Sequence, residues 1–236
     1  MKLYQIFFVV FLSFLWGCEN PNQTKEQVSS AANNPQQVSE VQDQEPDVNL
    51  NQEMALDQTS TQNPFHPFYI FEDKGSHQNH YIPSGFMPDG KCISFNDAWK
   101  ENCHSGDTCI KIDYDTECSQ NNQKWAGIYW LNPANNWGKR KGGFNLTGAD
   151  KLIFWAKGEK GGEQIQEFTV GGISGDYPDS DTTVIGPVIL TPEWKEYTVD
   201  LRGKDLSYIS GGFAWTTNVE VNPSSCVFYL DDIRFE

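Results

Sequence analysis

The chain has 236 residues, a length that allows one or at most two domains. Its formal net charge is −15, from 17 Lys and Arg residues against 32 Asp and Glu residues, so it is a poor candidate for binding a nucleic-acid backbone. Hydrophobic residues make up only 38% while aromatic residues reach 14%, which indicates a chain built from parts of different character.

The first 18 residues have the features of an export signal. An apolar run over residues 4–16 suits the central region of a signal peptide and is short for a membrane-spanning helix. It ends in Leu15-Trp16-Gly17-Cys18, which resembles a bacterial lipobox except that small residues are usual in place of Trp16. The resemblance implies that Cys18 carries acyl chains and anchors the protein in the bacterial cell envelope, at the outer membrane or cell surface in a Gram-negative organism. An ordinary signal peptide or an uncleaved anchor is the alternative.

Residues 19–64 contain no aromatic residue and are rich in Gln, Asn, Ser and Glu. Eight acidic residues and one lysine, Lys25, lie in this segment, which therefore holds about half of the excess negative charge. Such a composition does not bury enough apolar surface to offset the entropy cost of ordering the chain. We therefore predict a disordered linker between the anchor and a folded domain over residues 65–236.

The composition of residues 65–236 predicts an all-β fold. Short apolar or alternating runs are separated by clusters of Gly, Pro, Asn and Asp, and no helical stripe exceeds two turns. The predicted strands are Phe68–Glu72, Thr108–Tyr114, Trp125–Leu131, Lys151–Lys157, Ile165–Ile173, Thr183–Leu190, Trp194–Leu201, Gly212–Thr216 and Val227–Phe235. About nine strands without intervening helices favour an antiparallel β-sandwich of the jelly-roll type.

Five cysteines follow Cys18, and four of them lie within residues 92–118. Disulfides are permitted in an exported protein, so we expect two bridges in this loop-rich region and Cys226 as the unpaired thiol. The pairing is not determined by the sequence. A zinc site is the alternative, but no Cys-x-x-Cys pair occurs and His104 is the single histidine nearby.

The segment from Trp125 to Arg140 is the strongest candidate for a binding site. Aromatic side chains alternate along the predicted strand so that Trp125 and Tyr129 lie opposite Trp130, and one set must cover a surface outside the core. Aromatic faces beside amide groups and an arginine suit a sugar, whose C–H face stacks on a ring while its hydroxyls accept and donate hydrogen bonds. The alternative is that the rings are core and the asparagines shape turns.

Acidic residues raise two further hypotheses. Acid–base chemistry needs a pair of carboxylates at a defined separation, and two acidic groups exist, Asp113, Asp115 and Glu117 in one and Asp176, Asp179 and Asp181 in the other. Both groups have the pattern of solvated strand ends. Carboxylates at the end of the first strand, Glu72 and Asp73, and in the last strand, Asp231 and Asp232, suit Ca²⁺ if these strands are neighbours.

Taken together, the folded part resembles carbohydrate-binding modules of the galactose-binding-like jelly-roll type over residues 65–236. The matching pieces are Phe71-Glu72-Asp73, the segment Tyr129–Gly138, Leu152–Gly158, Leu190–Leu201 and the ending Phe228–Ile233. The resemblance implies a glycan-binding face that carries Trp125, Tyr129 and Trp155, with Asn132, Asn136, Trp137 and Arg140 at its rim. It also implies a structural calcium near Glu72, Asp73, Asp231 and Asp232. The cysteines of residues 92–118 depart from the family pattern.

The sequence therefore predicts an envelope lipoprotein that binds a polysaccharide or glycan without cleaving it. One alternative is a small β-sandwich glycan hydrolase or lyase. The other is an adhesin or envelope assembly component that has a protein partner.

Overall fold

The computed structural model describes residues 64–88, 90–118 and 124–236. The chain divides into two units, Met1–Gln58 and Thr59–Glu236, and all described residues belong to the second unit. The predictions for the signal segment 1–18, for the anchor at Cys18 and for all but the last residue of the linker 19–64 lie outside the described residues. No helix in the described part is long and apolar enough to cross a membrane.

The described residues form β-strands and contain no helix. The strands are β1 (Phe68–Phe71), β2 (Ile82–Met87), β3 (Ile93–Trp99), β4 (Cys109–Tyr114), β5 (Trp125–Leu131), β6 (Lys151–Gly158), β7 (Gln164–Ile165), β8 (Glu167–Gly171), β9 (Thr182–Ile185), β10 (Val188–Ile189), β11 (Lys195–Asp200), β12 (Gly211–Asn218) and β13 (Cys226–Phe235).

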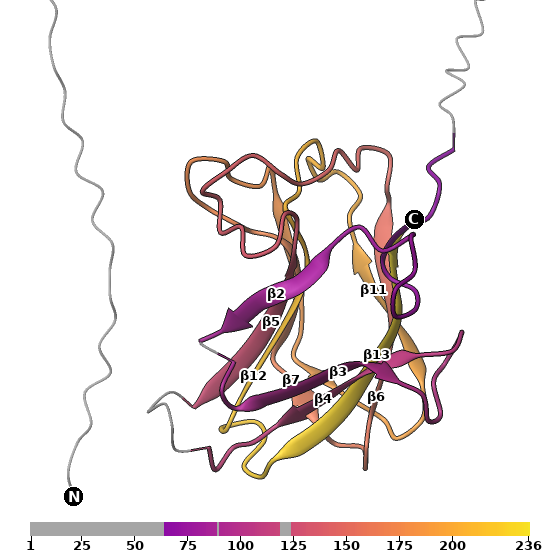
Figure 1. Ribbon diagram of the computed structural model, residues 1–236, viewed down its shortest axis with the longest axis vertical. Helices are drawn as coiled ribbons and strands as arrows, with labels where there is room; N and C mark the ends of the chain where they lie inside the picture. Colours follow the sequence, from indigo (N-terminus) through magenta and orange to yellow (C-terminus); the bar gives the residue numbers. More distant parts are fainter. Residues whose placement is uncertain (1–63, 89, 119–123) are drawn as a thin grey trace, which may run out of the picture. The chain divides into compact units, whose positions relative to one another are not determined.

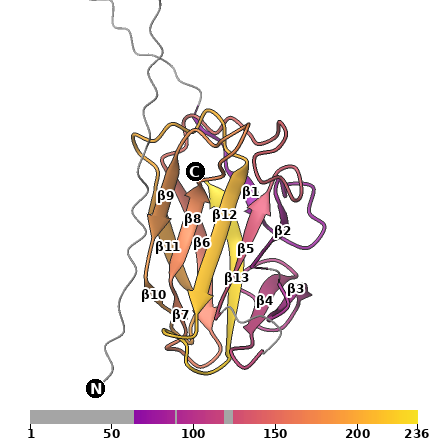
Figure 2. The ribbon, with the colours of Figure 1, turned by 90° about the vertical axis from the view of Figure 1, so that its left-hand side faces the viewer.

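Two antiparallel sheets pack face to face as a β-sandwich of the jelly-roll type (Figure 1). The six-stranded sheet has the order β11-β6-β13-β4-β3, and β1 also pairs with β13. The five-stranded sheet has the order β2-β5-β12-β8-β9, and these strands lie side by side in Figure 2. The short strands β7 and β10 pair with each other. The pairing of β1 with β13 confirms that the first and last predicted strands are neighbours.

The core lies between the two sheets and follows the alternation of each strand. Leu152, Phe154 and Ala156 point inward from β6 and are fully buried, as are Phe168 and Phe213 from the opposite sheet. The rings of Phe154 and Phe168 meet across the sandwich at 4.5 Å between centroids. Burial of each such large apolar side chain contributes roughly 1.5–3 kcal/mol, so the alternation determines which face of each strand turns inward.

Two strands were missed and two predicted strands are each divided in two. β2 and β3 are edge strands, paired on one side only, and β2 contains Pro83 and Gly85, which weaken a strand pattern. Predicted strand Ile165–Ile173 divides into β7 and β8 at Gln166, and predicted strand Thr183–Leu190 divides into β9 and β10 at Gly186-Pro187. The proline has no N–H to continue the ladder.

Two disulfides form within residues 92–118, as predicted. They join Cys92 to Cys118 and Cys103 to Cys109, with Cα atoms 5.5 and 5.4 Å apart. Cys226 is free and buried, which confirms it as the unpaired thiol. Burial raises the pKa of the Cys226 thiol to about 12, so it stays protonated at neutral pH.

Candidate functional site

An aromatic pair marks one end of the outer face of the five-stranded sheet. Trp137 is 39% exposed, and its ring meets the Tyr129 ring edge to face at 5.9 Å between centroids. Tyr129 belongs to β5 and lies between Gly85 of β2 and Ala214 of β12 in the sheet register. We call this surface, with Trp125, Tyr129 and Trp137, the Trp137 face.

The glycine in β2 makes room for this pair. A Cβ atom at Gly85 would lie 2.7 Å from the Cβ of Tyr129 and 2.9 Å from the Cζ2 of Trp137. Real Cβ atoms do not approach other heavy atoms this closely, so the Trp137 ring lies over the backbone of β2 at Gly85.

The Tyr129 ring is held in position by its hydroxyl, which donates a hydrogen bond to the Gly171 carbonyl oxygen at 2.7 Å. Burial raises the pKa of Tyr129 well above its usual range, and the carboxylates of Asp179 and Glu167 raise it further. The hydroxyl is therefore a neutral donor to the protein, and the ring offers a contact surface to a ligand.

Trp125 lies at the other end of the same face, four residues from Tyr129 along β5 and paired with Asn218 of β12. At the rise of an extended strand, four residues separate the two rings by about 13 Å. Gly127 and Thr216 lie between them on the same face, and the terminal methyl group of Met87 lies over Gly127. The result is a strip of sheet with aromatic rings at both ends.

The asparagines predicted at the rim hold a loop instead. Asn136 is 1% exposed, donates to the Arg140 carbonyl oxygen at 2.8 Å and accepts from the amides of Lys139 and Arg140. Asn132 donates to the His80 carbonyl oxygen and accepts from the Gly143 amide. The prediction that Asn136 contacts a ligand is wrong, because its side chain is buried and bonds to the backbone of the loop. Asn132 is engaged in the same way.

The exposed Arg140 belongs to the same loop. Its guanidinium donates to the Ala134 carbonyl oxygen at 2.7 Å. The loop over residues 132–144 is thus fixed by side chain to backbone bonds, and this order positions Trp137, which lies between Asn136 and Arg140.

Trp155 does not lie on the Trp137 face. It belongs to β6 in the six-stranded sheet, where it is paired with Asp231 and Glu196, and it points to the outside of that sheet. Tyr129 points to the outside of the other sheet, so the whole core separates the two rings. The prediction that they share one binding face is wrong, because it assigned each ring to a strand face without knowing to which sheet the strand belongs.

A second aromatic cluster covers the outer face of the six-stranded sheet, and the sequence did not identify it as a group. Its rings form a continuous series in which centroids lie 3.7–6.4 Å apart: Trp99 with Tyr229, Tyr229 with Trp194, Trp194 with His104 and His104 with Trp155. Lys111 and Lys157 lie over these rings. The outward alternation of Trp155 with Lys157 and of Tyr229 with Asp231 is the sequence signal that points to this face.

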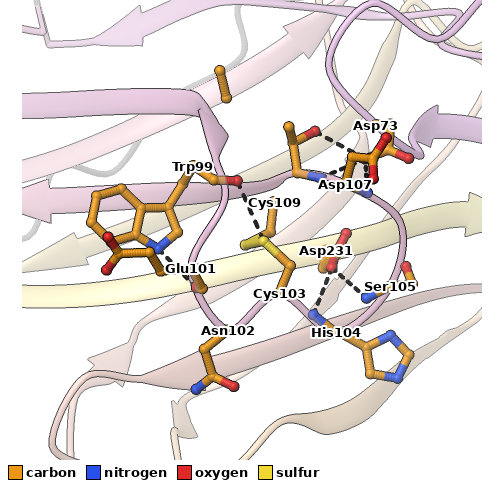
Figure 3. Close-up of a disulfide and its surroundings, with 12 residues drawn as sticks. Asp73, Trp99, Glu101, Asn102, Cys103, His104, Ser105, Asp107, Cys109 and Asp231 are labelled. Carbon is orange, nitrogen blue, oxygen red and sulfur yellow. Dashed lines mark hydrogen bonds between the residues drawn. A yellow bond between two sulfur atoms is a disulfide. The ribbon is translucent and has the colours of Figure 1, made fainter.

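The carboxylates predicted to bind calcium are used by a loop. Asp73 Oδ1 accepts hydrogen bonds from the amides of Asp107 and Thr108, and Asp231 Oδ2 accepts from the amides of His104 and Ser105 (Figure 3). The disulfide between Cys103 and Cys109 closes this loop.

The other two carboxylates have their own partners. Glu72 accepts from the Ser76 hydroxyl at 2.6 Å, and Asp232 pairs with Arg234. Within the described residues no group of three or more His, Cys, Asp or Glu side chains is arranged to hold a metal ion. In this arrangement Glu72, Asp73, Asp231 and Asp232 do not fit one calcium ion, although calcium binding by the protein stays a prediction.

Burial affects the titration of two groups beside this loop. It raises the pKa of Asp231 to about 6, although the three amides that donate to the carboxylate act in the opposite direction. It also lowers the pKa of His104, whose ring stacks on Trp155 and whose Nδ1 is enclosed without a hydrogen-bond partner. The neutral imidazole therefore acts as a packing group in this cluster.

Three of the acidic residues considered for catalysis, Asp115, Asp179 and Asp181, serve as hydrogen-bond acceptors within the protein. Asp179 accepts from the amides of Ile173, Ser210 and Gly211 and from the Ser210 hydroxyl. Asp181 accepts from the Thr182 amide. Hydrogen bonds of this kind hold the loop over residues 173–181 against the start of β12.

Searches of known proteins give likeness of structure only. No family model matches the sequence, and no curated protein matches it significantly. Among solved structures, the chain is similar to a family 30 carbohydrate-binding module (16% identity, 72% of this chain and 87% of the other, TM-score 0.47). It is also similar to a family 11 module of a Clostridium thermocellum cellulase (14%, 70% and 92%, 0.43) and to a family 29 module in complex with mannohexaose (11%, 72% and 90%, 0.42).

Proposed function

We propose that the folded part of this protein is a non-catalytic glycan-binding module and that the Trp137 face is its binding surface. The observation that carries the proposal is the position of the Trp137 ring, which is exposed beside Tyr129 and lies over Gly85 of β2. The ordered loop holds the Trp137 ring with part of its apolar surface exposed to water. In this position the ring can stack on the C–H face of a sugar.

The rest of the face supplies polar contacts. Asn218 lies beside Trp125, and Glu167 and Thr169 of β8 lie across from Thr216 and Ala214 of β12. Amide, hydroxyl and carboxylate groups of this kind bond sugar hydroxyls. These polar groups lie between the rings together with Met87, so we expect modest affinity at each site and a preference for a chain that reaches both rings.

The envelope location is part of the same proposal. Acylation of Cys18 would hold the protein at a membrane surface, with residues 19–64 as the connection to the binding module. The test is detergent phase partitioning of the protein and of Cys18→Ser after expression in a bacterium. The anchor predicts that only the variant moves to the aqueous phase.

Binding is tested with the purified full-length protein on a glycan array and in pull-downs with insoluble polysaccharides. Trp137→Ala is expected to weaken binding at least thirtyfold, which corresponds to about 2 kcal/mol, as for a central aromatic contact. Trp155→Ala is the matched control, because it removes the same side chain from the other sheet and is expected to keep the affinity. An arm with EDTA and with added Ca²⁺ tests the calcium prediction.

Two results would contradict the proposal. The absence of binding by a folded, monodisperse sample would favour the alternative with a protein partner. The release of new reducing ends from a bound polysaccharide would favour the hydrolase alternative.

A further inference from the structure

The outer face of the six-stranded sheet carries a row in which aromatic rings and lysines alternate. Lys111 Nζ lies 4.1 Å from the Trp99 ring centroid and 5.9 Å from the Tyr229 centroid. Lys157 Nζ lies 4.5 Å from the Tyr229 centroid and 5.7 Å from the Trp194 centroid. We call this set of five side chains the Tyr229 row.

The register of the sheet explains the order of the row. Tyr229 of β13 is paired with Lys111 of β4 on one side and with Lys157 of β6 on the other. The two lysines are therefore separated by two interstrand spacings, which is about 10 Å. They point to the same face of the sheet as Tyr229, with one tryptophan beyond each of them.

Neither lysine of the row has a carboxylate partner among the described residues. Other basic side chains of the described part, such as Lys74, Lys151 and Arg234, form ion pairs. The contacts of Lys111 and Lys157 are instead those to the rings. Aromatic faces attract an ammonium but leave its hydrogen-bond donors free.

Lys157 is arranged so that its charge remains available. The residue is 8% exposed, but its ammonium group is not fully enclosed. The aliphatic stem is therefore buried, and the charged end reaches the surface. Ordering a lysine in this way costs side-chain entropy and partial desolvation. A negatively charged ligand would compensate for both.

Acidic side chains limit how such a ligand lies. Asp113 lies two residues beyond Lys111 on β4, and Glu159 directly follows the end of β6 and accepts a hydrogen bond from the Tyr229 hydroxyl at 2.6 Å. Glu101 is the third carboxylate that acts on Tyr229, and together with burial the three raise the pKa of that hydroxyl. A negatively charged chain that ran along the strands would meet these carboxylates. A chain that crosses the strands along the Tyr229 row would meet only Glu159, whose carboxylate already accepts a hydrogen bond from the Tyr229 hydroxyl.

We propose that the Tyr229 row is a second binding site, for an acidic polysaccharide whose carboxylate or sulfate groups pair with Lys111 and Lys157. The half-buried rings of Trp99 and Trp194 flank the lysines and provide stacking surfaces for sugar rings. A nucleic acid fits this surface poorly, because duplex DNA carries one charge per about 1.7 Å and the row offers two cations on a protein of net charge −15.

The experiment is affinity electrophoresis of the full-length protein in gels with polygalacturonate, its methyl ester, dextran sulfate or dextran. We expect retardation by the anionic polymers, little by the two neutral ones, and a steep loss with added salt. Comparison of polygalacturonate with dextran sulfate shows whether the site prefers carboxylate or sulfate.

Lys111→Gln is the deciding variant, since Lys111 is half-buried and its replacement is expected to leave the fold intact. We expect about tenfold weaker binding to the preferred anionic polymer, and a similar loss for Lys157→Gln if thermal melting shows it to be folded. Lys195→Gln is the matched control, because Lys195 also lies near a tyrosine ring, that of Tyr197, on the same sheet. It is expected to bind as the unchanged protein does.

The two binding proposals fail separately. Trp137→Ala is expected to lower binding to neutral glycans and to leave binding to the anionic polymers unchanged. Equal binding of Lys111→Gln and the unchanged protein, equal losses in Lys111→Gln and Lys195→Gln, or equal affinity for polygalacturonate and its methyl ester would each overturn the second site while leaving the first intact.

Discussion

The two outer faces of the sandwich are built by the same alternation but differ in what fills them. On the Trp137 face the middle of the sheet carries Gly127, Thr216 and Met87 and no aromatic ring, and the rings lie at its ends, with one of them exposed. On the six-stranded sheet the rings meet one another in a continuous series, two lysines lie among them, and a disulfide-closed loop packs against them.

The difference shows that an aromatic side chain on an outer face has two separate uses. Where its neighbours are small it is left as a contact surface, as Trp137 is. Where its neighbours are large it becomes part of a satellite cluster that also stabilises the fold, as Trp155 is between His104 and the sheet. Variants of the two faces are therefore expected to separate binding from stability.

The largest expected effect comes from the disulfides, both of which lie on the side of the six-stranded sheet. In the chain-entropy model, removal of the Cys92–Cys118 bridge, with 26 residues of separation, costs about 3.5 kcal/mol of unfolding free energy. Removal of the Cys103–Cys109 bridge, with six, costs about 2.2 kcal/mol. Paired serine variants and chemical denaturation measure both.

The Cys103–Cys109 bridge begins directly after Asn102, whose carbonyl oxygen accepts a hydrogen bond from Trp194 Nε1. Its removal is therefore expected to weaken binding to acidic polysaccharide and to spare binding to neutral glycan. The Cys92–Cys118 variant is the control. If both variants lost binding at both faces, the assignment of the loop to one face would be wrong.

Trp155→Ala is expected to lower the free energy of unfolding by about 2 kcal/mol, because it removes a half-buried ring that stacks on His104 at 3.7 Å. Trp137→Ala, at an exposed position, is expected to change it by less than about 0.5 kcal/mol. Denaturant midpoints at unchanged slope measure both values. A larger loss of stability in Trp137→Ala than in Trp155→Ala would show that the Trp137 ring, rather than the Trp155 ring, stabilises the fold.

Gly85→Ala tests the floor of the Trp137 face. The added methyl group would displace the Trp137 ring, and we expect about tenfold weaker binding to neutral glycan, which is about 1.4 kcal/mol. The double variant with Trp137→Ala is expected to bind no more weakly than Trp137→Ala alone. Additive losses would show that Gly85 acts through something other than that ring.

The fold could be predicted from the sequence further than the site. Alternation assigned Leu152, Phe154 and Ala156 to the core, and the clustering of the other four cysteines within residues 92–118 left Cys226 at the start of the last strand as the unpaired thiol. Both predictions were correct because they depend on patterns that are local in the sequence. The shared face of Tyr129 and Trp155 was predicted wrongly, since sheet membership depends on pairing between distant strands. The Tyr229 row was missed for the same reason, as its members come from five separate segments.

The smallest effect concerns Asp231, whose pKa of about 6 in the folded protein lies above its ordinary value of 3.8. Between these values the folded state binds more protons than the unfolded state, so this group lowers stability as pH rises from about 4 to about 6.

The variant Asp231→Asn has no carboxyl group to titrate at this position. The stability advantage of the unchanged protein over this variant is therefore expected to shrink across this interval, by at most about 1.4 kcal/mol per pH unit. Asp113→Asn is the control for a carboxylate on the same face. If the difference in stability between the unchanged protein and Asp231→Asn stayed constant from pH 4 to pH 6, the pKa of Asp231 would be the same in the folded and unfolded states. The hydrogen bonds from the loop amides would then offset the effect of burial.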